Sequence, residues 1–169
     1  MIKKILLAAA ILLPAMFASA QTVKIGLVDT NAVIAAMPET TAAQTKLAES
    51  TKKYEDEYAK LGEEMKRMYD ELNNMKSDEL QAIKDRKTRE FTDYQQKMQT
   101  FEQTAAQDLQ KMQQELMAPI VQKVQQAITS VGQEGGYSLI QDANPQIVLF
   151  HASPVVDVTA DVKAKLGIK

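Results

Sequence analysis

Large apolar residues in the middle of the chain follow the pattern of two helices packed against each other. From Leu47 to Met75 they recur at alternating steps of four and three residues, the repeat that makes helices supercoil. Beyond a short polar turn, further apolar positions match these in mirror order, as Phe101 matches Tyr54, and the two numbers of each pair sum to 155 or 156. We therefore expect an antiparallel helical hairpin with its tip near residues 76–79.

Two prolines mark where this hairpin meets the rest of the chain. Pro38 precedes the outgoing helix, which we place at residues 39–75, and Pro119 lies almost level with Pro38 in the returning helix. A proline inside a helix costs about 3 kcal/mol or produces a kink, so we expect a kink at Pro119. The arm then comprises residues 39–119.

The chain on both sides of the arm predicts short strands and helices. Residues 23–28 (VKIGLV) predict a strand, with a brief helix through Met37 after it. Residues 137–141 (YSLIQ) and 146–151 (QIVLFH) predict two more strands joined by a turn.

Short polar residues and glycines predict where the helices begin and end, because a side-chain oxygen can cap the first turn and glycine readily follows the last one. The expected N-caps are Asp29 or Thr30, Ser77, and Thr159. The expected helix ends are Asn73 or Asn74, about Val131 before a group of glycines, and Leu166 before Gly167.

Residues 21–38 and 120–169 together form a body of about 70 residues, and a chain of that size buries little more than about 60% of its unfolded surface. Few, short strands also leave unpaired edges, so we expect copies of the chain to assemble through this body. The predicted fold class is α+β and mostly helical, with a long antiparallel two-helix coiled-coil arm that projects from a small β-containing oligomerisation body.

The first twenty residues have the composition of an export signal. Two lysines precede an apolar stretch from Ile5 to Phe17, and residues 18–20 (ASA) supply a cleavage pattern, so we expect the mature chain to begin at Gln21. Removal of the two lysines leaves 18 of the 20 basic residues against 22 acidic ones, a net charge of −4. This balance gives no reason to expect nucleic-acid binding, and the absence of cysteine excludes disulfides and thiolate metal sites.

Catalytic chemistry has little support in the sequence. The chain has one histidine, His151, and none of the common nucleophile, zinc-protease or phosphate-loop motifs. Acidic runs such as residues 55–57 favour a solvated face over a metal site, because neighbours on a helix point apart. We expect no enzymatic activity, no cofactor and no metal.

Flexible apolar side chains on the arm are candidates for a binding surface. Methionine adapts to many partners, and a two-helix seam covers its own residues only in part. The candidates are Tyr54, Tyr58, Met65, Met68, Tyr69, Met75, Met98 and Met112. The alternative is that these residues serve only as the seam of the hairpin.

A basic patch near the tip is a second candidate surface, for acidic headgroups or phosphates. The alternative is an ordinary solvated face, since neighbouring glutamates dilute the charge. The patch consists of Lys84, Arg86, Lys87 and Arg89.

Four segments resemble the Skp or OmpH-like periplasmic chaperone family, and the resemblance covers the whole mature chain. The arm resembles the family mainly in its pattern. The segments are KIGLVDTNAVI with Pro38, PIVQKVQQAI at 119–128, GGYSLIQDAN at 135–144 and VVDVTADV at 155–162.

The resemblance implies a periplasmic homotrimer, in which the short strands of three subunits form one body and three arms enclose a cavity, as in a jellyfish. Family members hold unfolded outer-membrane proteins in this cavity without ATP and pass them to the membrane assembly machinery. The resemblance also implies transient contact of the basic patch with the membrane or with lipopolysaccharide. Our leading hypothesis is therefore an ATP-independent holdase chaperone. The alternative is a structural coiled-coil adaptor that binds one defined envelope partner through the same arm.

Overall fold

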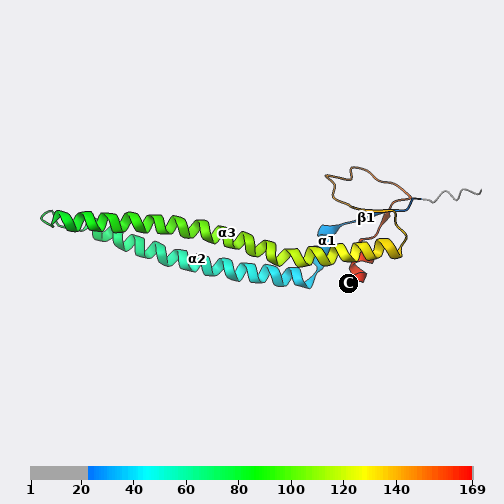
Figure 1. The fold of residues 1–169 in the computed structure, drawn as a ribbon, viewed down its shortest axis with the longest axis horizontal. Helices are drawn as coiled ribbons and strands as arrows, with labels where there is room; N and C mark the ends of the chain where they lie inside the picture. Colours follow the sequence, from blue (N-terminus) through cyan, green and yellow to red (C-terminus); the bar gives the residue numbers. More distant parts are fainter. Residues whose placement is uncertain (1–22, 169) are drawn as a thin grey trace, which may run out of the picture.

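The computed structural model describes residues 23–168, and the predicted export signal with its cleavage point before Gln21 lies outside them. Figure 1 shows a long helical hairpin joined at one end to a small body. The elements, in chain order, are β1 (Ile25–Val28), α1 (Thr30–Ala36), α2 (Pro38–Asn73), α3 (Gln81–Glu134), β2 (Leu139–Asp142), β3 (Val156–Asp157) and α4 (Thr159–Lys165).

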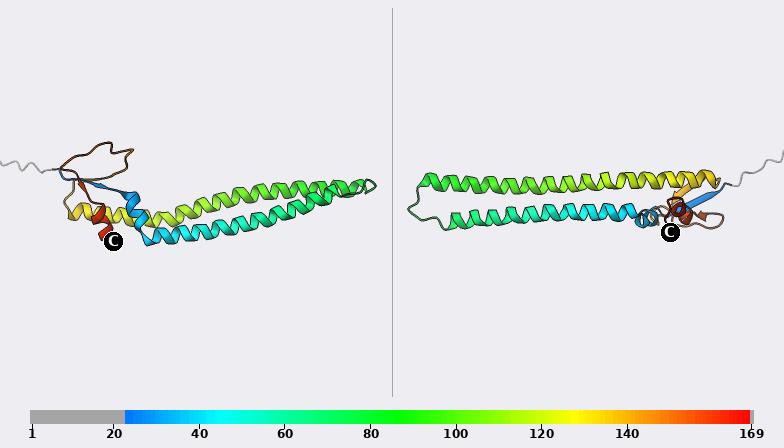
Figure 2. Two further views of the ribbon diagram at one scale, coloured as in Figure 1. Left: turned by 180° about the vertical axis from the view of Figure 1, so that it is seen from behind. Right: turned by 90° about the horizontal axis from the view of Figure 1, so that it is seen from below.

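The arm consists of α2 and α3, which run antiparallel and side by side in both views of Figure 2. The ring centroids of Tyr54 and Phe101 lie 6.0 Å apart, which confirms this predicted pair. Towards the tip the seam shifts, because Tyr69, which the strict repeat places outside it, lies 6.1 Å from Phe91 between ring centroids. A helix with 3.6 residues per turn drifts relative to a 3.5-residue repeat, which accounts for the shift.

The tip of the arm differs from the prediction on its returning side. The outgoing helix ends at Asn73, as its asparagine stop predicts. The returning helix begins at Gln81 without a side-chain capping bond, so the expected Ser77 cap is wrong. The Glu79 amide donates to the Lys76 carbonyl at 3.2 Å, and this turn occupies the residues that would have formed the first helical turn.

The three strands form one parallel sheet in the order β2-β1-β3. Ile25 pairs with Leu139 on one side of β1, and Gly26 pairs with Val156 on the other. The strands predicted at residues 23–28 and 137–141 are confirmed at their central residues.

The strand predicted at residues 146–151 is wrong. The Asn144 amide donates to the Asp142 carboxylate at 3.1 Å, and the Gln146 amide donates to the Asn144 side chain at 2.9 Å. These consecutive turns curl the chain away from an extended path. The third strand is instead Val156–Asp157, which pairs with the remaining edge of β1.

The core of the body lies between the sheet, α1, α4 and the end of α3. The burial of Ile120, Val124, Ala127 and Val131 confirms the four-and-three spacing that assigns them to the body. The helix continues through Pro119 without a break, and Figure 1 shows its axis changing direction where the arm enters the body. The core consists of Val28, Val33, Met37, Ala43, Ile120, Val124, Ala127, Val131, Val158 and Val162.

Polar contacts fix the ends of the body's helices. The Ala32 amide donates to the Asp29 carboxylate at 2.8 Å, which confirms Asp29 as the cap of α1. The expected capping role of Thr159 is wrong, because α4 begins at Thr159 itself and its hydroxyl accepts a bond from the Asp29 amide at 2.9 Å. The threonine therefore ties α4 to the end of β1. The other end of α4 is followed by Gly167 with a φ of +74°, as predicted.

Candidate functional site

The eight candidate residues for apolar binding all lie on the arm, but they differ in how much surface they offer. Tyr58 and Tyr69 are the most open, 41% and 54% exposed. Met98 is only 7% exposed and therefore contributes packing within this chain rather than accessible surface. The other five are half-buried: Tyr54, Met65, Met68, Met75 and Met112.

An aromatic cluster occupies the middle of the arm. The ring of Phe101 on α3 lies between Tyr54 and Tyr58 on α2, with centroid distances of 6.0 and 6.5 Å. Met112 lines a neighbouring hollow of about 290 Å³ together with Tyr54 and Phe101. Charged side chains line the hollow as well, those of Lys53 and Glu57.

The Tyr54 hydroxyl orients this cluster. It donates a hydrogen bond across the arm to the Asp108 carboxylate at 3.0 Å. The bond and the nearby negative charge raise the pKa of Tyr54, so the phenol stays protonated and remains a donor. Its ring is thereby held on the seam with one edge towards solvent.

A larger hollow of about 760 Å³ lies near the tip, on the side of the arm formed by the end of α2 and the start of α3. Met75 and Ile83 are its large apolar residues. Both signs of charge surround them, because Lys66, Arg67 and Glu79 also line the hollow. The hollow can therefore accept an apolar side chain together with neighbouring charged side chains of either sign.

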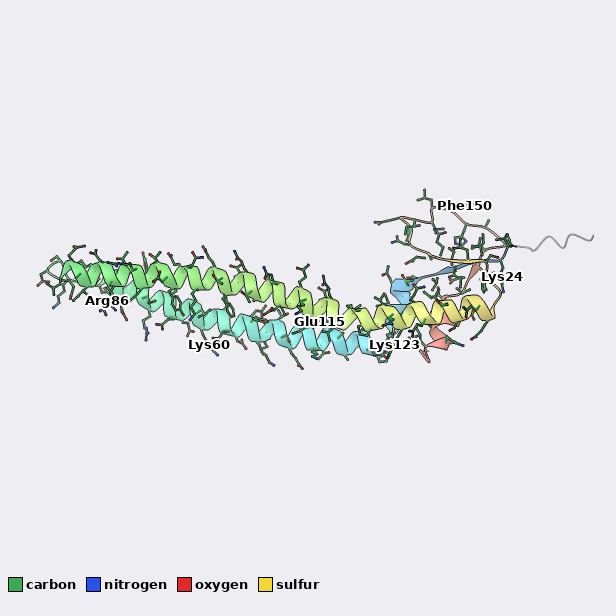
Figure 3. The ribbon with its side chains drawn as sticks, in the orientation of Figure 1. Lys24, Lys60, Arg86, Glu115, Lys123 and Phe150 are labelled. Carbon is green, nitrogen blue, oxygen red and sulfur yellow. The ribbon has the colours of Figure 1, made fainter. Side chains whose placement is uncertain are left out.

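Three of the four residues of the basic patch have partners within the arm. Lys84 donates to the Ser77 carbonyl at 3.1 Å, and Arg86 lies 3.9 Å from the Glu90 carboxylate. Lys87 pairs with Glu71 on α2, and this bond lowers the pKa of the Glu71 carboxyl. Figure 3 shows Arg86 near the tip. The patch is therefore a set of partly neutralised cations spread over the tip rather than a single focus of positive charge.

Surface hollows interrupt the packing where the arm joins the body. Two hollows of about 290 and 310 Å³ lie at this junction, and Ala43 and Leu116 line both of them. Ile34, Leu47 and Met117 also line the first hollow. One ion pair crosses the junction, from Lys123 on α3 to Glu39 on α2 at 2.7 Å, and it lowers the pKa of the Glu39 carboxyl.

The most exposed apolar side chains lie on the body, where the sequence predicted a strand. Leu149 and Phe150 are 89% and 85% exposed, and Ile147 is also exposed. Figure 3 shows Phe150 on the loop between β2 and β3, which arches away from α3. The run QIVLFH, which predicts a strand, was the sequence signal for this surface.

Within residues 23–168, no group of three histidine, cysteine or acidic side chains is placed to hold a metal ion. No helix in the same range is long and apolar enough to cross a membrane. His151 is an exposed residue of the loop between β2 and β3.

The fold and the arm surface define a class of protein: a small α+β body that carries a long helical hairpin with a partly open apolar seam. The chain belongs to the family of OmpH-like outer membrane proteins, whose family model matches residues 24–166. This match confirms the family resemblance seen in the sequence. Among known proteins it is similar to the chaperone protein Skp of Yersinia enterocolitica, with 29% identity over 149 residues that span 86% of this chain and 87% of that protein.

Proposed function

We propose that this protein is a periplasmic, ATP-independent holdase chaperone that binds unfolded outer-membrane proteins between its arms and keeps them from aggregating. The observation that carries the proposal is the row of half-buried methionines and tyrosines along the arm. Membership of the OmpH-like family and similarity to a protein named as a chaperone support it. Export by cleavage before Gln21 and action in the periplasm are part of the same proposal.

The shape of the arm surface suits an unfolded client better than a folded partner. Its hollows at the tip and in the middle of the arm are open and are lined by both apolar and charged side chains. Each can hold a side chain weakly, and methionine lets the same hollow fit different side chains. Many weak contacts spread over the arm retain a client without one tight pocket, so the client can leave without ATP.

Assembly into a homotrimer is the second part of the proposal. Within residues 23–168 the sheet has three strands, so β2 and β3 each have an edge without a partner strand. Close to them, the adjacent side chains of Leu149 and Phe150 are almost fully exposed, and neighbouring exposed apolar side chains are candidates for an interaction surface. Three copies that cover these surfaces would place their arms around one cavity.

Native mass measurement tests the assembly. We expect a trimer for the mature chain and a large monomer fraction for the Leu149→Ser/Phe150→Ser variant. The matched control is Leu80→Ser, which removes an apolar side chain that is 70% exposed at the arm tip, and this variant should remain trimeric. A monomeric mature chain, or equal dissociation of both variants, would contradict the proposed interface.

Light scattering tests the holdase. An unfolded outer-membrane barrel protein is diluted from urea with the mature chain in molar excess, and we expect it to stay soluble. The Tyr58→Gln/Tyr69→Gln variant should need about fivefold more protein for half-protection, the effect of losing about 1 kcal/mol of binding free energy. The control is Val121→Gln, which changes an exposed apolar residue of the body. Failure of the mature chain to protect the client would contradict the function, and equal loss in both variants would contradict the site.

Contact with anionic lipid or lipopolysaccharide completes the proposal. Arg86 and Arg89 are exposed at the patch, and Arg86 has only a long contact to Glu90. We expect Arg86→Gln/Arg89→Gln to reduce co-sedimentation with vesicles that contain lipopolysaccharide. Unchanged co-sedimentation of this variant would contradict a role for the patch.

A further inference from the structure

The sulfur atoms of this protein are all thioethers. The chain has nine methionines and no cysteine, and seven of the methionines lie within the described residues 23–168. Without a thiol, methionine is the side chain on which an oxidant acts most readily. Its reaction at each position depends on whether an oxidant in solution can reach the sulfur atom.

Burial separates the methionines into two groups. Met37 in the body core and Met98 in the middle of the arm are 2% and 7% exposed. The other five are half-buried on the arm, which means that each has one side on solvent and another on the neighbouring helix: Met65, Met68, Met75, Met112 and Met117.

Three of the half-buried residues also line hollows on the arm. Met75 lines the large hollow at the tip, Met112 the hollow of about 290 Å³ beside the aromatic cluster, and Met117 the hollow at the arm base. A water molecule occupies about 30 Å³, so each hollow admits a peroxide, which is only slightly larger. The oxidant therefore reaches these residues without any opening of the helices.

We propose that Met75, Met112 and Met117 form an oxidation-sensitive site, at which sulfoxide formation loosens the seam of the arm while the body stays folded. The oxidant is hydrogen peroxide or a related hydroperoxide. A lone pair of the sulfur attacks one peroxide oxygen, the O–O bond breaks, and the second oxygen leaves as water, or as the alcohol of a hydroperoxide, after taking up the proton. Sulfur is oxidised by two electrons and the peroxide is reduced by two.

The effect on the arm depends on the surroundings of each sulfur. The sulfoxide oxygen is a strong hydrogen-bond acceptor, and beside Met112 the nearest aromatic residues are Tyr54 and Phe101. The Tyr54 hydroxyl already donates to Asp108, so the new acceptor either competes for it or turns outward, away from the aromatic rings, to water or to Lys53, which lines the same hollow. Both outcomes weaken the contact between α2 and α3. Met37 keeps its thioether, because the core covers it. Met117 packs against the edge of this core at the arm base, so its oxidation also weakens the contact between arm and body, while the buried interior of the body keeps its packing.

Site-resolved oxidation of the mature chain is the first test. The protein is treated with hydrogen peroxide, quenched and digested, and the sulfoxide at each methionine is measured by mass spectrometry. We expect Met75, Met112 and Met117 to oxidise at least tenfold faster than Met37 and Met98, and this difference to disappear in urea. Equal rates in the native protein would overturn the proposal.

Thermal melting of the helical circular dichroism signal is the second test. We expect oxidation to lower the melting midpoint by about 2–4 °C, the effect of roughly 1 kcal/mol in a domain of about 150 residues, and a methionine sulfoxide reductase to restore it. The Met75→Leu/Met112→Leu/Met117→Leu variant, in which volume is conserved, should lose this sensitivity. The control variant Met65→Leu/Met68→Leu should keep most of the sensitivity to oxidation.

Two outcomes would contradict the proposed site: a melting midpoint that oxidation leaves unchanged, or a loss of the sensitivity in the control variant instead. Neither test depends on the protein being a chaperone.

Discussion

The body and the arm bury their apolar residues to very different degrees, although one helix, α3, belongs to both. In the body Val33, Val158 and Val162 are completely buried. Along the much longer arm beyond the junction, the buried apolar residues are Leu61, Met98 and Ala105. The body surrounds its core with a sheet and helices. Each arm helix, by contrast, packs against one other helix of the chain, which covers only one side of its apolar residues. Two packed helices therefore leave part of the arm's apolar surface exposed and available for binding.

The two regions also use different side chains. The body core is rich in valine, whose branched side chain is held in one preferred rotamer. The arm seam is rich in methionine, tyrosine and phenylalanine, which are longer and, in the case of methionine, easily rearranged. The same chain thus combines a rigid base with an adaptable surface.

The largest expected difference between the two regions concerns isoleucine in α3. Ile120 is 3% exposed in the body core, and Ile120→Ala should cost about 2–5 kcal/mol, because it leaves a cavity. Ile83→Ala, the same substitution at a half-buried position near the tip, should cost about 1 kcal/mol. Urea unfolding followed by circular dichroism measures both changes. Equal costs would show that the arm is packed as tightly as the body.

Two glycines should respond with opposite signs to the same change. A Cβ atom at Gly135 would lie 2.5 Å from the Tyr137 ring and 2.9 Å from the Val131 carbonyl, so Gly135→Ala should destabilise the body by about 1–3 kcal/mol. A Cβ atom at Gly62 on α2 meets nothing within 4 Å, so Gly62→Ala should stabilise the arm by up to about 1 kcal/mol through helix propensity. Thermal melting of the two variants checks both signs, and destabilisation by Gly62→Ala would show a contact on that face of the arm.

Acidification should have the smallest effect, and in the arm it should act through two paired carboxylates. Hydrogen bonds from Lys123 and Lys87 lower the pKa values of Glu39 and Glu71 below their ordinary value of 4.5. The folded arm therefore binds these protons less readily than the unfolded chain does. The resulting stabilisation is present above pH 4.5 and is lost as the pH falls through the lowered pKa values. Because both pairs are exposed, the loss is small.

Melting midpoints measured between neutral and acidic pH check this prediction. The Glu39→Gln/Glu71→Gln variant should be slightly less stable at neutral pH and should lose less stability on acidification. A variant with the same pH dependence as the unsubstituted chain would place the acid-sensitive groups elsewhere.

Local pattern was enough to predict the hairpin and much of the body. The Tyr54–Phe101 pair, the end of α2 at Asn73, the Asp29 cap and the burial of Ile120 were all expected from spacing and residue type. Each of these features depends on residues close in sequence or on a repeat that continues over many turns, and such signals accumulate along a helix.

Apart from the Ser77 cap, which a local turn between Lys76 and Glu79 displaces, the errors lie where a choice depended on distant residues. Residues 146–151 contain a run of strand-favouring apolar residues, but the edge of β1 pairs with Val156–Asp157 instead. Thr159 resembles a cap, but its hydroxyl is engaged by Asp29 from the far end of the chain. The candidate binding residues could be chosen by type, whereas their exposure, from open Tyr69 to buried Met98, depends on the rotation of each helix against the other.

The sequence by itself therefore determined that the chain is a helical hairpin on a small mixed body, because apolar periodicity and proline positions act through local backbone geometry. Only the tertiary structure decided which segment completes the sheet and which seam residues remain open. Those outcomes depend on pairings between segments up to 130 residues apart, and residue type alone does not specify them.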